Sequence, residues 1–163
     1  MSATLSVLAR ESMHPLDPGR AVTRSRLRVR FCETDLMGIV HHSNYLAYFE
    51  AGRVEWLRRR GVTYADWASR GIHLPVVEAS VRYRAPARFD DVIAIETHLV
   101  ELRAASVRFE YRMERIGDEP ELLAEGFTRL ACVNERHMVQ RFSGETLATF
   151  GSAEIAPPGD TLG

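Results

Sequence analysis

The stretch FCETDLMGIVHHSNYLAYFEAGRVEWLRRRG, residues 31–61, contains the segment around which the rest of the chain is arranged. Its second half, residues 44–60, predicts one long helix that stops at Gly61. The apolar side chains of this helix are Tyr45, Leu46, Tyr48, Phe49, Ala51, Val54, Trp56 and Leu57. They cover much of its circumference, so we expect burial on more than one side. Ser43 or Asn44 can cap its start, and arginines in its last turn suit the helix dipole.

Alternation of apolar and polar residues predicts strands on both sides of this helix. We expect a half-buried first strand from Leu27, in which Leu27, Val29 and Phe31 alternate with arginines. Further strands are expected over residues 73–84, 92–102, 106–116, 122–134 and, as a short piece, 138–142. Residues 63–69 and 143–150 predict short helical segments. A curved antiparallel sheet wrapped around the long helix would cover it on several sides, which predicts an α+β fold.

Composition sets the class of protein. A chain of 163 residues suits one domain, expected over residues 25–150 with a flexible tail at 1–24 and a loose tail at 151–163. The net charge of -1 gives no reason to expect a nucleic-acid partner. The sequence contains no apolar run of about 18 residues, so we predict no membrane span. Its first residues lack the apolar stretch that a signal peptide would need. We therefore expect a cytoplasmic protein.

Asp35 is the first candidate for chemistry, because it lies between the first strand and the long helix, with His42 seven positions later. Its carboxylate could cap a short turn over residues 36–38. It could also lie beside the positive end of the long helix, where free amides stabilise an oxyanion. A carboxylate acting there as nucleophile or general base would suit acyl transfer. The spacing is compatible with both interpretations.

Other reactive side chains carry weaker patterns. We expect the adjacent side chains of His41 and His42 to diverge, and no third ligand has suitable spacing, so we predict no metal site. Cys32 as a nucleophile would need a histidine base, and its strand setting favours a packed thiol. Glu50 could be catalytic or could pair with Arg53, three residues later on the helix.

Two blocks of the sequence, in this order, share a family pattern. The first comprises Glu33, Thr34, Asp35, Gly38, Ile39, Val40, His42, Asn44, Tyr45, Tyr48, Phe49, Glu50 and Arg53. The second is YRAPARFDD, residues 83–91, running into residues 95–97. Together they resemble hotdog-fold acyl-CoA thioesterases of the 4-hydroxybenzoyl-CoA and Tol–Pal-associated types, over roughly residues 27–140. This resemblance implies the hotdog fold, a curved antiparallel sheet around one central helix.

The resemblance also implies an activity and a site. Water and an acyl thioester would give a carboxylic acid and a free thiol, with Asp35 as the catalytic carboxylate. The backbone amide of His42 falls on the oxyanion donor, and its imidazole matches a histidine that orients substrate or water. Arg103 falls near a segment that holds coenzyme A phosphates. The substrate-binding positions are Gly38, Val40, His41, Asn44, Tyr45 and Arg103. No cofactor is implied beyond coenzyme A as part of the substrate.

The sequence departs from the family pattern at a few positions. Phe31 stands where some relatives carry a tyrosine. His41 stands where several relatives carry an aromatic residue, a change that would reshape the acyl pocket. Ala104 and Ala105 replace basic residues, which weakens the expected grip on the nucleotide. Acyl group and carrier, coenzyme A or acyl carrier protein, stay open.

The family further implies a homodimer or homotetramer with the site between subunits. Two alternative functions use the same fold. A hotdog hydratase or dehydratase would carry an Asp and a His about five positions apart in a different motif, which this chain lacks. A non-catalytic acyl-CoA-binding module would not need Asp35.

Overall fold

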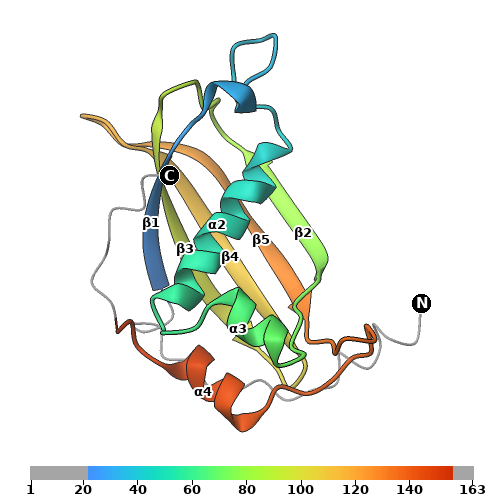
Figure 1. Cartoon of the computed structure of the whole chain (residues 1–163). Helices are drawn as coiled ribbons and strands as arrows, with labels where there is room; N and C mark the ends of the chain where they lie inside the picture. Colours follow the sequence, from blue (N-terminus) through green and yellow to red (C-terminus); the bar gives the residue numbers. More distant parts are fainter. Residues whose placement is uncertain (1–21, 156–163) are drawn as a thin grey trace.

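The computed structural model describes residues 22–155. It contains one antiparallel sheet with the strand order β1-β3-β4-β5-β2. The strands are β1 (Val22–Arg28), β2 (Val76–Tyr83), β3 (Val92–Leu102), β4 (Ser106–Arg115) and β5 (Glu121–Ala131). The helices are the 3-10 turn η1 (Phe31–Glu33), α2 (Asn44–Arg58), α3 (Tyr64–Ser69) and α4 (Gly144–Gly151). Figure 1 shows α2 crossing one face of the curved sheet.

The core lies between α2 and the sheet. Phe49 and Trp56 of α2 are fully buried. Phe49 stacks on Tyr111 of β4 with ring centroids 4.3 Å apart, and Trp56 meets Phe109 edge-on at 5.3 Å. Gly52 allows the close approach of helix and sheet, because a Cβ there would lie 2.5 Å from the side-chain oxygen of a β3 threonine. The predicted α+β hotdog architecture, a curved sheet around one long helix, is therefore confirmed.

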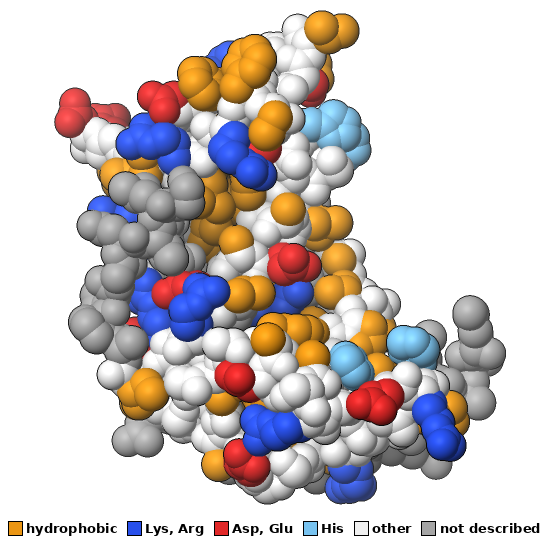
Figure 2. Space-filling model, viewed as in Figure 1, with side chains coloured by type: hydrophobic (Ala, Val, Ile, Leu, Met, Phe, Trp, Pro, Cys, Tyr) orange, Lys and Arg blue, Asp and Glu red, His pale blue; other side chains and the backbone are white. Residues whose placement is uncertain are grey.

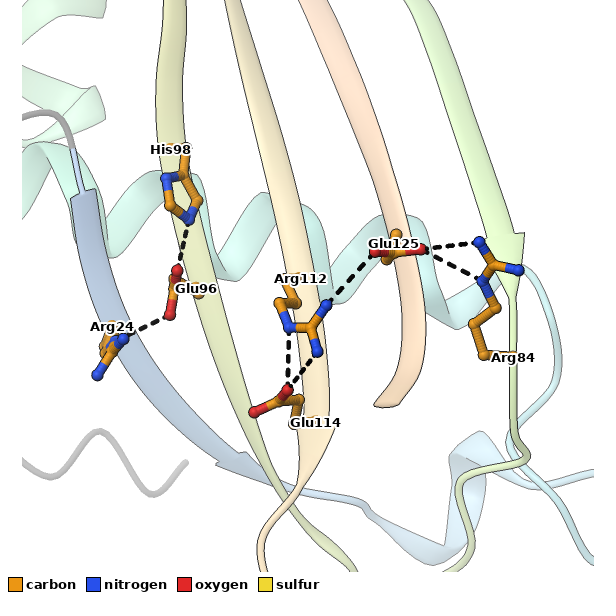
Figure 3. Close-up of polar contacts among 7 residues, drawn as sticks. All are labelled: Arg24, Arg84, Glu96, His98, Arg112, Glu114 and Glu125. Carbon is orange, nitrogen blue, oxygen red and sulfur yellow. Dashed lines mark hydrogen bonds and ion pairs between the residues drawn. The ribbon is translucent and has the colours of Figure 1, made fainter. Parts of the chain in front are cut away.

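The outer face of the sheet is charged. A row of alternating sign runs along the cross-strand register from Arg24 on β1 through Glu96 and Arg112 to Glu125 on β5. Arg24 pairs with Glu96 at 2.9 Å, and Glu125 accepts from Arg112 at 3.5 Å and from Arg84 at 3.0 Å (Figure 3). Such exposed pairs each contribute about 0–1 kcal/mol. They mark this face as solvated, which leaves the helix side as the only apolar face of the sheet.

The first strand lies earlier in the chain than expected. β1 begins at Val22, and Phe31 belongs to η1 instead and is 75% exposed. The buried positions of β1 include Thr23 and Ser25, whose hydroxyls conceal the strand from a search for apolar alternation. The expected N-terminal tail lies outside the described residues, except for its last three residues, which form the start of β1.

The C-terminal part confirms one expectation and corrects two. α4 forms where a helical turn was expected. No strand forms over residues 138–142, where Val139 makes only an isolated bridge. The residues that directly follow α4 are not loose, because the N–H of Ile155 donates to the carbonyl of Arg59 at 2.8 Å. The remainder of the expected C-terminal tail, residues 156–163, lies outside the described residues.

Candidate active site

A cleft of about 370 Å³ opens between the loop that precedes α2 and the segment that follows β2. Asp35 and His42, the catalytic pair expected from the sequence, both line it. The other lining residues are Met37, Ile39, Val40, Tyr45, Tyr83, Arg84, Ala85 and Pro86. The cleft therefore combines one carboxylate and one histidine with a largely apolar and aromatic wall.

Asp35 is held in a tight turn. Its carbonyl accepts from the N–H of Gly38 at 2.9 Å, and its Oδ1 accepts from the N–H of Met37 at 2.8 Å. Gly38 has a φ of +73°, which glycine adopts readily. Asp35 thus caps the 36–38 turn, which is one of the two interpretations that the sequence left open. Within residues 22–155 no hydrogen bond reaches the second carboxylate oxygen, Oδ2, so it is open to water or substrate.

His42 lies two residues before the first residue of α2. Across the described part of the chain its backbone N–H has no acceptor, while its carbonyl accepts from the Tyr83 hydroxyl at 2.9 Å. An unbonded amide at the positive end of a helix attracts negative charge. The predicted side-chain cap is wrong: Ser43 stands at the cap position without capping, and the Asn44 side chain donates to the carbonyl of Glu33 at 2.8 Å.

Glu33 holds the loop before α2 in place, a role that the sequence did not reveal. Its buried carboxylate accepts from the N–H of Arg30 at 2.8 Å and from the Tyr48 hydroxyl at 2.9 Å, and its carbonyl accepts from the N–H of His41 at 2.9 Å. Burial opposes its ionisation, but these hydrogen bonds and the Arg30 guanidinium lower the pKa of Glu33 overall. Burial and the hydrogen bond to Glu33 raise the pKa of Tyr48. Glu33 is therefore a charged anchor of the site.

The opposite wall comes from the end of β2 and was not predicted to belong to the site. Tyr83 meets the Tyr45 ring edge-on, with centroids 5.0 Å apart. Arg84 is turned to the outer face, where Glu125 accepts from its guanidinium. Only the second block of the family resemblance pointed to this segment, because no local periodicity can indicate a contact across 41 residues.

Of the other predicted substrate-binding positions, some lie at the cleft and some do not. Val40 is buried in the cleft wall, whereas His41 is exposed and its Nδ1 lies 2.8 Å from Ser43 Oγ. Arg103 follows β3, whose start lies near the cleft, and pairs with Glu101. Eleven strand residues span about 36 Å, so Arg103 does not reach the cleft of its own chain.

The other reactive groups do not form a second centre. Glu50 is exposed and lies 3.9 Å from Arg53, as the pairing on the helix predicts. Cys32 is exposed, contrary to the expected packed thiol, while burial raises the pKa of the Cys132 thiol to about 11. Among residues 22–155 no three His, Cys, Asp or Glu side chains come together in a way that could hold a metal ion. Over the same residues, no helix is both long and apolar enough to cross a membrane.

Known proteins are similar to this chain in sequence and in fold. The family model described as the thioesterase-like superfamily matches residues 29–150. The acyl-CoA thioester hydrolase YbgC of Escherichia coli is 32% identical over 115 residues, which cover 71% of this chain and 84% of YbgC. The structure of a hypothetical protein from Thermus thermophilus is 43% identical, with a TM-score of 0.74 over 79% of this chain and 95% of that one. The gentisyl-coenzyme A thioesterase BH1999 is 26% identical, with a TM-score of 0.69 over 75% and 97%. From its sequence and its fold together, this chain belongs to the thioesterase-like superfamily.

Proposed function

We propose that this protein hydrolyses acyl thioesters and that Asp35 is its catalytic carboxylate. One observation carries the proposal: the open oxygen of Asp35 and the unbonded amide of His42 belong to residues that line the same cleft. Thioester hydrolysis needs a group that delivers oxygen to the carbonyl carbon and a donor that stabilises the resulting oxyanion. The two residues supply one of each.

The His42 amide would bind the carbonyl oxygen of the substrate as negative charge develops on it. Loss of one such donor typically raises the barrier by about 3–4 kcal/mol. Asp35 would either attack the carbonyl carbon to form an anhydride that water then cleaves, or remove a proton from the attacking water. In both routes the thiol leaves and the acid product is released. The His42 imidazole would orient substrate or water.

The wall of the cleft indicates the kind of acyl group. Ile39, Val40, Tyr45 and Tyr83 present apolar and aromatic surface beside Asp35. An apolar acyl chain or an aromatic acyl group would bury this surface, at about 25 cal/mol per Å² removed from water. Because YbgC is named an acyl-CoA thioester hydrolase, coenzyme A is the proposed carrier, with acyl carrier protein as the alternative.

We further propose that two chains pair through β2. This strand is at an edge of the sheet and is exposed along most of its length, with Val76 47% and Val77 43% exposed. Figure 2 shows hydrophobic side chains along the right-hand side of the molecule, where β2 lies in Figure 1. Pairing would cover the edge and this apolar surface. Arg103 could then serve only a site on a neighbouring chain.

The test of the activity is thiol release from a panel of thioesters. Aliphatic acyl-CoAs of increasing length, aromatic acyl-CoAs and one acyl carrier protein thioester should each be incubated with wild-type protein. We expect thiol and free acid to form in equal amounts from at least one of them, in proportion to protein concentration. A protein that hydrolyses none of these thioesters would refute the proposal.

The test of the assembly is sedimentation of the same protein. We expect a dimer or tetramer at the concentrations used for the activity measurement. A monomer with full activity would contradict a site that is shared between chains.

A further inference from the structure

Tyr83 makes one hydrogen bond that links two distant parts of the site. It is the last residue of β2, and its hydroxyl donates to the carbonyl of His42 at 2.9 Å, across 41 residues of chain. Within residues 22–155, no other side chain bonds to the backbone of His42. Tyr83 therefore holds the residue whose amide is the proposed oxyanion donor.

The ring of Tyr83 is itself held in place. It packs edge-on against Tyr45 at an interplanar angle of 87°, and the Tyr45 hydroxyl accepts from the N–H of Ala87 at 3.3 Å. The carbonyl of Ala87 accepts from the N–H of Val40 at 2.8 Å. The segment that follows β2 is thus bonded to the chain on both sides of His42, to Val40 in the loop and to Tyr45 in α2.

Without Tyr83, little would fix this carbonyl. The other bond to the His42 carbonyl comes from the N–H of Tyr45, at a long 3.4 Å. A long bond is weaker, so the first turn before α2 would gain freedom to rotate. An oxyanion donor is effective only when it is aimed at the developing charge, and a displacement of about 1 Å can cost about 100-fold in rate.

We propose that Tyr83 is a positioning residue that aims the His42 amide at the oxyanion. This inference rests on the proposed thioesterase function. The Tyr83 hydroxyl would act on the transition state and not on the bound substrate, because the oxyanion forms only during the reaction. Its removal should therefore lower kcat and leave KM nearly unchanged.

The test is Tyr83→Phe, which removes the hydroxyl and keeps the ring. We expect kcat to fall about tenfold and KM to stay within about twofold of the wild-type value. The matched control is Tyr64→Phe, because the Tyr64 hydroxyl also donates to a backbone carbonyl, that of Leu74 at 3.0 Å, away from the cleft. This control should lower the melting temperature and leave kcat unchanged.

A second readout does not depend on activity. Hydrogen exchange of the Tyr45 amide, followed by NMR, should become about tenfold faster in Tyr83→Phe, because its acceptor carbonyl is no longer held. An unchanged kcat, or an unchanged exchange rate, would overturn the inference. A raised KM with unchanged kcat would do so as well, since it would mean that the Tyr83 hydroxyl contacts the bound substrate. Failure of the proposed function is distinct: wild-type protein would then release no thiol, or Asp35→Asn would stay active.

Discussion

Phe49→Ala tests the central packing of the fold. The Phe49 side chain has 0% exposure and stacks on Tyr111 with an interplanar angle of 6°. A buried aromatic side chain removes about 150–250 Å² from water, which at ~25 cal/mol per Å² is about 4–6 kcal/mol as an upper bound. Partial collapse of the cavity reduces this value, so we expect a loss of about 3–5 kcal/mol in the free energy of unfolding. This is a large share of a typical ~5–15 kcal/mol.

The assay is equilibrium unfolding in urea, with Phe31→Ala as the matched control. Phe31 is 75% exposed and makes one edge-on ring contact with Phe89. Its truncation should change the free energy of unfolding by less than about 1 kcal/mol. If Phe49→Ala lost no more stability than this control, the Phe49 ring would not be packed between α2 and the sheet.

Two further predictions concern other parts of the structure. Gly126→Ala should lower the melting temperature strongly, because its Cβ would lie 2.1 Å from a backbone oxygen of β2. Gly144→Ala is the control: its Cβ would have nothing within 4 Å, so the melting temperature should stay the same or rise slightly. The lowered pKa of Glu33 means that its charge stabilises the fold above its unfolded pKa of about 4.3, and that this stability is lost as pH falls through the lower folded value. Glu33→Gln should therefore be less stable than wild type at pH 7 by about 1–3 kcal/mol, with the gap closing below about pH 4; a constant gap would contradict the anchoring role.

The sequence predicted the elements whose burial follows from apolar periodicity. The strand over residues 92–102 forms with the expected bounds, and the long helix differs only at its C-terminal end. β1 was misplaced because two of its buried positions, Thr23 and Ser25, are hydroxyl residues. The buried Thr23 hydroxyl is satisfied by a hydrogen bond that it accepts from Arg60 at 2.9 Å, a contact that no local pattern reveals.

Only those residues of the candidate site that lie close together in the sequence could be predicted from it. Asp35 and His42 lie within one short stretch, so their place before the helix could be inferred. The bond of Tyr83 to His42, across 41 residues, and the bond of Tyr48 to Glu33, across 15 residues, could not be inferred from a local pattern. The family assignment is confirmed by the matching model and by the fold. The roles of Asp35, His42 and Arg103, the absence of a metal or cofactor, the cytoplasmic location and the assembly stay predictions.

Asp35→Asn, measured beside Asp66→Asn, tests the central claim most directly. Each aspartate accepts one backbone N–H: Asp35 accepts from Met37 at 2.8 Å in the turn before α2, and Asp66 accepts from Thr63 at 2.9 Å in the first turn of α3. Asparagine can keep this acceptor oxygen while it removes the charge. A positioned base or nucleophile contributes about 10²–10⁴-fold in rate. We predict at least a ~100-fold lower kcat for Asp35→Asn, an unchanged kcat for Asp66→Asn, and melting temperatures within a few degrees of wild type for both. Turnover by Asp35→Asn near the wild-type rate would contradict the assignment of Asp35 as the catalytic carboxylate.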